Sequence, residues 1–332
     1  MKALRTHAVG GPDTLTLDTV DDPVPAAGQV VVAVKACAIN FPDTLMIRDL
    51  YQFKPERPYA PGGEIAGVVE SVGEGVTAFR PGDRVFGGIG NGGLAEKVAV
   101  DTRRLFPVPE GVPFEKAASL MMTYGTTIHG LKDRAHIKPG DVMLVLGAAG
   151  GVGLSAVELG KAFGAKVIAA VSSEEKGEVA RRAGADDVVI YPREAMDKDA
   201  SKALANAFKA ACGPEGANIV YDIVGGQYSE PALRAIAWEG KFLVVGFPAG
   251  IAKMPLNLTL LKSCDICGVF WGAFTMREPE KFKAQAAELF ELLKAGKIDP
   301  LISETFPLER GGEAIAKLEN REAVGKLVVT FD

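Results

Sequence analysis

The sequence predicts an α/β protein in which a doubly wound parallel sheet is joined to a smaller β domain. Between residues 124 and 274, short apolar strands alternate with helical segments, and a glycine-rich turn connects the first strand to the first helix. Before residue 124, short apolar runs are separated instead by Pro-Gly pairs. With 332 residues the chain is long for a single core, so two domains are expected.

The first 123 residues are expected to form the β domain. This part is rich in Val and Gly, and its apolar runs predict strands over residues 29–36, 64–72, 83–87 and 94–100. Short runs bounded by Pro and Gly are typical of a small β domain.

Residues 124–274 are expected to form the domain with the parallel sheet. Six apolar runs predict its strands, over residues 142–146, 166–171, 187–190, 218–224, 241–246 and 266–270. Helical crossovers between them make the sheet doubly wound. In residues 275–332 we expect a helix ending at Ala295 before Gly296, a second helix over 309–319 and a strand over 325–330. We expect this last segment to return to the first domain.

The first βα turn of the parallel sheet predicts a bound dinucleotide. Residues 138–155 read as a turn, a buried strand and a glycine-rich corner that opens a helix near Gly151. Such a corner lets backbone N–H groups approach a pyrophosphate, while the positive end of the helix stabilises its charge. The corner residues are Ala149, Gly150, Gly151, Val152 and Gly153. A strand, turn and helix without a ligand is the alternative, but the second strand completes a βαβ unit and favours the cofactor.

The end of the second strand favours NADPH over NADH. An NAD site usually places a carboxylate there, whereas this chain has Ser172 and Ser173, followed by Lys176. Two hydroxyls and an ammonium suit a 2′-phosphate. Two observations point the other way. Glu174 and Glu175 lie between Ser173 and Lys176, and Lys176 would also suit a solvated position at the start of a helix.

Composition excludes several other classes of protein. The net charge of −5 provides no broad basic field for nucleic acid or an anionic membrane. No apolar run is long enough to span a bilayer, and the first residues lack a secretory apolar core, so a cytoplasmic location is expected. Four scattered cysteines predict reduced thiols. No metal site is expected, because the three histidines, His7, His129 and His136, do not have ligand spacing.

Six blocks of sequence resemble the medium-chain dehydrogenase/reductase superfamily, and most closely its zinc-free quinone oxidoreductase branch. They are AINFPD at 38–43, PGGEIAG at 61–67, GDRV at 82–85, TYGT at 123–126, AAGGVG at 148–153 and REAVGKLVV at 321–329. The resemblance covers essentially the whole chain. It implies a GroES-like β-barrel catalytic domain followed by a Rossmann domain, with NADPH as cofactor.

The resemblance also implies the type of reaction. Zinc-dependent relatives carry a cysteine ligand where this chain has Asn40, and a histidine where it has Gly63. Without a Lewis acid, reduction of a quinone or another α,β-unsaturated carbonyl is favoured, because the enolate that develops needs only hydrogen-bond donors and a proton source. The resemblance therefore implies a metal-free, NADPH-dependent oxidoreductase.

Three residues are implied to line a cleft near the nicotinamide, namely Asn40, Tyr51 and Thr126. Asn40 or Thr126 would hydrogen-bond the carboxamide or the acceptor oxygen, and Tyr51 would donate to the substrate. Each has a structural alternative: a cap for the turn at Pro42, a helix start, or a packed loop aromatic. Asp43 is expected to support the pocket rather than act as a base.

The resemblance also implies further contacts to the cofactor. Lys176, Tyr191 and Arg321 would surround the 2′-phosphate. Gly246 and Phe247 follow the fifth strand, where the nicotinamide should lie.

Two alternative functions and one partner complete the expectations. One alternative is a 2-enoyl-CoA reductase of the acrylyl-CoA type, for which Arg48, Lys54 and Arg57 would supply a basic groove. The other is a cofactor-binding protein with little turnover, similar to lens crystallins. The edge of the sixth strand is expected to pair with a second copy, which gives a homodimer.

Overall fold

The computed structural model describes residues 1–332, which divide into two compact units. The first comprises Met1–Met122 and Pro300–Asp332, and the second comprises Thr123–Asp299. The chain therefore returns to the first unit at Pro300 and not at residue 275. The reason lies in helix α10 (Pro279–Lys294), which is tied to Asp133 of the second unit: Gln285 donates to its carboxylate at 2.8 Å and Lys281 pairs with it at 2.9 Å.

The second unit contains the predicted parallel sheet. Its six strands run in the order β10-β9-β8-β11-β12-β13, and every neighbouring pair is parallel. They are β8 (Val142–Leu146), β9 (Lys166–Val171), β10 (Asp187–Ile190), β11 (Ala217–Asp222), β12 (Ile236–Val244) and β13 (Asp265–Gly268). The strand order reverses between β8 and β11, which creates a topological switch point where ligands bind in such sheets. The predicted fold class of this part is confirmed.

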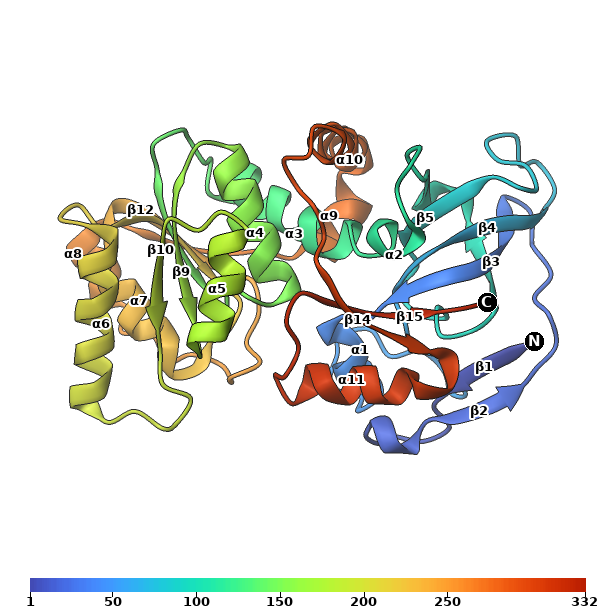
Figure 1. The fold of residues 1–332 in the computed structure, drawn as a ribbon, viewed down its shortest axis with the longest axis horizontal. Coiled ribbons are helices and arrows are strands. Elements are labelled where there is room, and N and C mark those ends of the chain that lie inside the picture. Colours follow the sequence, from blue (N-terminus) through green and yellow to red (C-terminus); the bar gives the residue numbers. More distant parts are fainter. The chain divides into compact units, whose positions relative to one another are not determined.

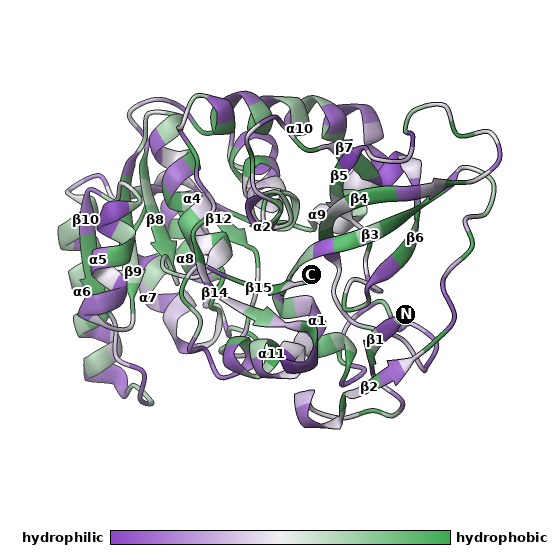
Figure 2. Cartoon of the chain, turned by 45° about the vertical axis from the view of Figure 1, so that its right-hand side comes forward, coloured by the Kyte–Doolittle hydropathy of each residue, from purple (hydrophilic) through white to green (hydrophobic).

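Helices cover both faces of this sheet, with α4 and α5 on one face and α6 and α7 on the other (Figure 1). The α-helices of the unit are α3 (Thr126–Ile128), α4 (Gly151–Ala162), α5 (Glu174–Arg182), α6 (Lys198–Cys212), α7 (Ser229–Arg234), α8 (Asn257–Lys262), α9 (Trp271–Arg277) and α10. Two π-helical segments, Met121–Gly125 and His129–Arg134, flank α3, and a 3-10 turn spans Gly226–Tyr228. Because both faces are covered, the strands are largely hydrophobic (Figure 2).

The first unit is built around a seven-stranded sheet in the order β14-β15-β3-β4-β5-β7, with β6 pairing β3, and a separate two-stranded sheet β1-β2. Its strands are β1 (Lys2–Arg5), β2 (Thr16–Thr19), β3 (Gln29–Ala38), β4 (Glu64–Val72), β5 (Arg84–Gly88), β6 (Lys97–Asp101), β7 (Leu105–Pro107), β14 (Ile302–Pro307) and β15 (Lys326–Thr330). Its α-helices are α1 (Phe41–Met46), α2 (Phe114–Ala117) and α11 (Gly311–Glu319), with 3-10 turns at Pro12–Thr14, Thr102–Arg104 and Leu308–Arg310.

The C-terminal strand joins the middle of this sheet. β15 pairs antiparallel with β3, so that Val328 lies opposite Ala38. Inward-facing residues of β3 and β15, among them Val32 and Val329, are fully buried in one core. The pairing brings the residues immediately after β3 next to the start of β15.

Some predicted boundaries differ from the structure. β12 begins at Ile236 and not at residue 241, and the run predicted over 94–100 forms β6 from Lys97, after an isolated bridge at Ala95. The strand predicted over 29–36 extends to Ala38, because β4 and β15 both pair with its last residues. No helix has both the length and the apolar character needed to cross a membrane.

Candidate functional site

The glycine-rich corner lies at the carboxyl end of β8, as predicted. Gly147 has a φ of +71°, which turns the chain sharply after the strand. A Cβ atom on Gly153 would lie 2.2 Å from the Gly147 carbonyl oxygen, so only glycine lets α4 begin this close to the strand. The five predicted corner residues, Ala149 to Gly153, therefore form one compact turn.

The first turn of α4 presents unsatisfied backbone donors. Its N-cap is Gly150, and no side chain caps the helix. The first intrahelical bond is donated by the Leu154 N–H to the Gly150 carbonyl at 2.8 Å, so the N–H groups before it have no acceptor within the helix. With the positive end of a 12-residue helix at the switch point of the sheet, the corner fits a dinucleotide pyrophosphate.

The end of β9 carries cationic and hydroxyl groups, while its two carboxylates have other partners. Ser173 caps α5 and accepts from the Lys176 N–H at 3.4 Å. Glu174 pairs with Arg181 at 2.6 Å, and a hydrogen bond from Ser173 lowers the pKa of Glu175. Both carboxylates thus have partners within α5 or its cap, which fits a 2′-phosphate better than a free ribose hydroxyl.

Tyr191 lies next to this position but is largely enclosed. Its N–H donates to the Val171 carbonyl at 2.8 Å, which sets it beside the end of β9. Its ring packs on Tyr228 with 4.6 Å between centroids, and only 8% of the residue is exposed. Lys176 and Ser172, which are both half-buried, lie at the same edge of the sheet, whereas Arg321 is an exposed residue of the first unit.

The carboxyl ends of β11 and β12 are organised by a buried acid that the sequence analysis did not identify. Asp222 accepts from the N–H groups of Val224 and Gly225 at 2.9 and 2.8 Å, and from the Ser229 hydroxyl. Burial raises the pKa of Asp222. The Gly246 N–H donates to the Asp222 carbonyl at 3.3 Å. The signal was an acid that ends an apolar strand and is followed by Gly-Gly. Phe247 comes next and is 49% exposed.

Thr126 lies between the two π-helical segments and is partly exposed. It is therefore inside a helical run and does not cap a helix. The next residue, Thr127, links this run to the cofactor helix, because its hydroxyl lies 2.7 Å from the Ser155 hydroxyl and 2.9 Å from that of Tyr221. The fully buried contacts fix the Thr126 segment against α4 and β11.

The first unit holds a buried polar cluster around Asn40. This residue follows β3 and is 6% exposed. Its Nδ2 donates to the Ala38 carbonyl at 3.2 Å and to Glu64 Oε2 at 3.0 Å, and its Oδ1 accepts from Lys326 Nζ at 2.6 Å. The Asn40 amide is therefore held on all sides by the protein.

Lys326 is the buried cation of this cluster, and the sequence analysis did not identify it. Its Nζ lies 3.5 Å from Glu64 Oε2 and donates to the Ile39 carbonyl at 3.2 Å. Glu64 also accepts from the Met122 N–H at 2.8 Å. Burial lowers the pKa of Lys326 and raises that of Glu64, while their mutual attraction opposes both shifts. At the start of an apolar strand, a lysine gives no sequence signal of burial.

Asp43 is a buried acid that anchors Asn40 and influences Tyr51. Its carboxylate accepts from the N–H groups of Asn40 and Gly62 at 2.8 and 3.0 Å, and burial raises its pKa to about 6. Burial and the Asp43 charge raise the pKa of Tyr51, whose hydroxyl makes no hydrogen bond within the chain. Asp43 therefore holds the backbone of Asn40 and acts on Tyr51 through its charge, and the Tyr51 phenol stays protonated at neutral pH.

The donor set of the chain does not form a metal centre. No group of three or more His, Cys, Asp or Glu side chains is placed to hold an ion. Cys37 lies near Asp43 and Glu64, but burial raises the pKa of its thiol well above the usual range, which disfavours the thiolate that would bind a metal. All four cysteines are free.

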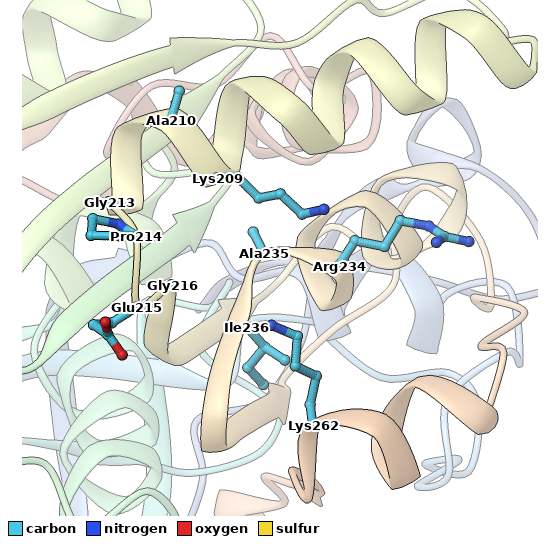
Figure 3. Close-up of a pocket in the computed structure, with 10 residues that line it drawn as sticks. All are labelled: Lys209, Ala210, Gly213, Pro214, Glu215, Gly216, Arg234, Ala235, Ile236 and Lys262. Atoms are coloured by element: carbon cyan, nitrogen blue, oxygen red, sulfur yellow. The ribbon is translucent and has the colours of Figure 1, made fainter.

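A cavity of about 560 Å³ in the second unit is lined by residues other than those of the glycine-rich corner, and Figure 3 shows this lining. Ile236 and Gly216 line it, so it opens at the amino ends of β11 and β12. Its cations, Lys209, Arg234 and Lys262, lie in the last turns of α6, α7 and α8. There they offset the negative helix ends, which accounts for their presence without a ligand.

Two family models match the chain. The alcohol dehydrogenase GroES-like domain matches residues 26–110, and the zinc-binding dehydrogenase domain matches residues 151–291. The first model supports the predicted GroES-like β domain. The second covers the strands from β9 to β13 and the last three residues of the glycine-rich corner.

The chain is also similar to individual proteins over most of its length. It is 40% identical to a quinone oxidoreductase-like protein 2 homolog of Nematostella vectensis, over 91% of this chain and 81% of that protein. Among solved structures, a mycobacterial protein in complex with NADPH has a TM-score of 0.91 and 32% identity. The Escherichia coli quinone oxidoreductase in complex with NADPH has a TM-score of 0.89 and 29% identity. Both alignments cover 100% of each chain. This chain therefore belongs to the quinone oxidoreductase family of the medium-chain dehydrogenase/reductase superfamily, a family of oxidoreductases.

Proposed function

We propose that this protein is an NADPH-dependent reductase that delivers hydride to a quinone or another α,β-unsaturated carbonyl without a metal ion. The observation that carries the cofactor choice is the end of β9, where Lys176 and Ser172 are present while Glu174 and Glu175 have other partners. The relatives solved with NADPH support the same choice.

When bound, NADPH supplies the hydride. The corner from Ala149 to Gly153 would hold its pyrophosphate through backbone N–H groups and the positive end of α4. Lys176 and Ser172 would bind the 2′-phosphate, with Tyr191 beside them, and the family resemblance adds Arg321. Gly246 and Phe247, at the carboxyl end of β12, would flank the nicotinamide.

Tyr51 is the proposed donor to the acceptor. Its hydroxyl has no partner within the chain, and burial and the Asp43 charge keep the phenol protonated by raising its pKa. A protonated hydroxyl at this position stabilises negative charge that develops on a carbonyl oxygen, and this stabilisation is stronger in a half-buried site than in water.

Asn40 and Thr126 are proposed to complete the site in different ways. Both N–H groups of the Asn40 amide already have acceptors, so its contribution is to hold the start of α1, which carries Asp43, and to offer its remaining oxygen lone pair. Thr126 is partly exposed beside the buried Thr127–Ser155 contact and would orient the carboxamide or the acceptor oxygen.

The experiment that tests this function measures NADPH oxidation with three acceptors: a simple ortho-quinone, a short enone and a short 2-enoyl-CoA thioester. Turnover of the quinone or the enone supports the proposal. Preference for the thioester would reassign the protein to acyl-CoA reduction, with Arg48, Lys54 and Arg57 as the next residues to test. Tight NADPH binding with no turnover of any acceptor would instead indicate a crystallin-like binding protein.

We also propose a homodimer formed through β13. This strand ends the parallel sheet, so one side of its backbone has no strand partner, and Leu260 and Leu261 of the preceding α8 are 79% and 62% exposed. An Ile266→Asp variant should sediment as a monomer where the parent protein sediments as a dimer.

We also propose a cytoplasmic location, because the four cysteines are free thiols.

A further inference from the structure

Arg193 lies at the edge of the sheet where the 2′-phosphate is proposed to bind. β10 pairs in parallel with β9, with Ile190 opposite Val171, and the Tyr191 N–H donates to the Val171 carbonyl at 2.8 Å. Arg193 therefore leaves the sheet two residues after this contact, next to the segment that begins with Ser172. The family resemblance implies Lys176, Tyr191 and Arg321 around this phosphate, but not Arg193.

The backbone on both sides of Arg193 is clamped. The Tyr228 hydroxyl donates to the Pro192 carbonyl at 2.8 Å, and the Gln227 side chain donates to the Glu194 carbonyl at 2.8 Å. The guanidinium itself is exposed and makes no ion pair. Arg193 is therefore a cation on a backbone that is held at two points, and the protein gives it no counter-ion. Such a cation can bind an external anion.

Electrostatics places Arg193 close to Lys176. The pKa of Lys176 is lowered first by burial and then by the positive charge of Arg193. Glu174, at the start of the neighbouring α5, is paired with Arg181. The two cations thus lie at the same edge of the sheet, and a dianionic group between them would relieve their repulsion.

We propose that Arg193 is a specificity-determining residue that binds the 2′-phosphate of NADPH together with Lys176. The planar guanidinium can donate two parallel hydrogen bonds to one phosphate, whereas the Lys176 ammonium contributes a point charge. This inference rests on the proposed use of NADPH and adds to it the residue that rejects NADH.

The test measures binding of two nucleotides that lack nicotinamide, 2′,5′-ADP and 5′-AMP, by calorimetry on the unmodified protein and on Arg193→Gln. No turnover is needed. Loss of a charge-assisted hydrogen bond at a partly exposed site should weaken 2′,5′-ADP about ten-fold and leave 5′-AMP unchanged. Lys176→Ala should show the same selective loss, and Arg193→Lys should recover part of it.

Lys209→Gln is the matched control, because Lys209 is an exposed cation of the same unit that lies at the amino ends of the strands. This variant should bind both nucleotides as tightly as the unmodified protein does. Undiminished preference for 2′,5′-ADP in Arg193→Gln would overturn the inference and leave the NADPH proposal standing. An equal loss of affinity for both nucleotides would also overturn the inference, because Arg193 would then attract any nucleotide and would not recognise the 2′-phosphate. No preference in the unmodified protein would overturn both the inference and the use of NADPH.

Discussion

Lys326 Nζ donates to Asn40 Oδ1 at 2.6 Å, although the two residues are 286 positions apart in the sequence. The antiparallel pairing of β15 with β3 creates this contact, and Glu64 of β4 receives a hydrogen bond from the same Asn40 amide. Three strands thus hold Asn40, the second residue after β3, in a single orientation.

Replacing Lys326 should destabilise the first unit strongly. In Lys326→Met, Glu64 remains buried without its cation, and breaking one side of a buried ion pair costs about 3–5 kcal/mol. Urea unfolding followed by circular dichroism measures the change. Lys54→Met, at an exposed lysine of the same unit with no ion pair, is the control. Equal stability of the two variants would show that the buried pair contributes nothing.

The stability of the protein should depend on pH through Asp43. Its folded pKa of about 6 lies above the usual 3.8, so the neutral acid is favoured by folding. This contribution is fully present below the unfolded pKa near 3.8 and is lost as pH rises through about 6, in total about 3 kcal/mol. The difference in unfolding free energy between the parent and Asp43→Asn should therefore change between pH 4 and 7. A constant difference would mean that Asp43 does not titrate in this window.

Tyr51→Phe should slow acceptor reduction without affecting the cofactor. Loss of the proposed hydrogen bond to the developing oxyanion should lower kcat by about ten-fold, while the Kd for NADPH stays unchanged. Tyr59→Phe is a matched control, because the Tyr59 hydroxyl is buried without any partner. A variant with unaltered kcat would remove Tyr51 from the reaction.

Activity should survive a strong chelator. The family model is named for zinc, but Asn40 and Gly63 replace two ligands and no other group of three donor side chains converges. Turnover should therefore be the same before and after dialysis against chelator, with metal content followed by mass spectrometry. A loss of activity that added zinc restores would contradict the metal-free mechanism.

The sequence predicted best what depends on neighbouring residues. Each strand of the parallel sheet is a local apolar run, and the corner from Ala149 to Gly153 depends on glycines a few residues apart, so strand and turn positions were visible. Lys326 and Arg193 were not identified, because their surroundings depend on strands that meet only in the folded sheet. Asp222 was missed although its hydrogen-bond partners lie within seven residues of it. The environment of Tyr191 was likewise invisible, since the ring packs on Tyr228 from a later strand-helix connection.

The division of the chain was harder to predict for the same reason. The helix after residue 278 was expected in the returning segment, but its Gln285 and Lys281 both contact Asp133. Only tertiary contacts of this kind decide to which unit a solitary helix belongs.

The most direct test of hydride transfer to a conjugated carbonyl uses NADPH deuterated at the nicotinamide carbon that releases hydride, with a short enone as acceptor. Mass spectrometry and NMR of the product then locate the label. The account predicts one deuterium on the carbon β to the carbonyl, with the neighbouring position protonated from solvent. Reduced product without deuterium at that carbon would contradict it.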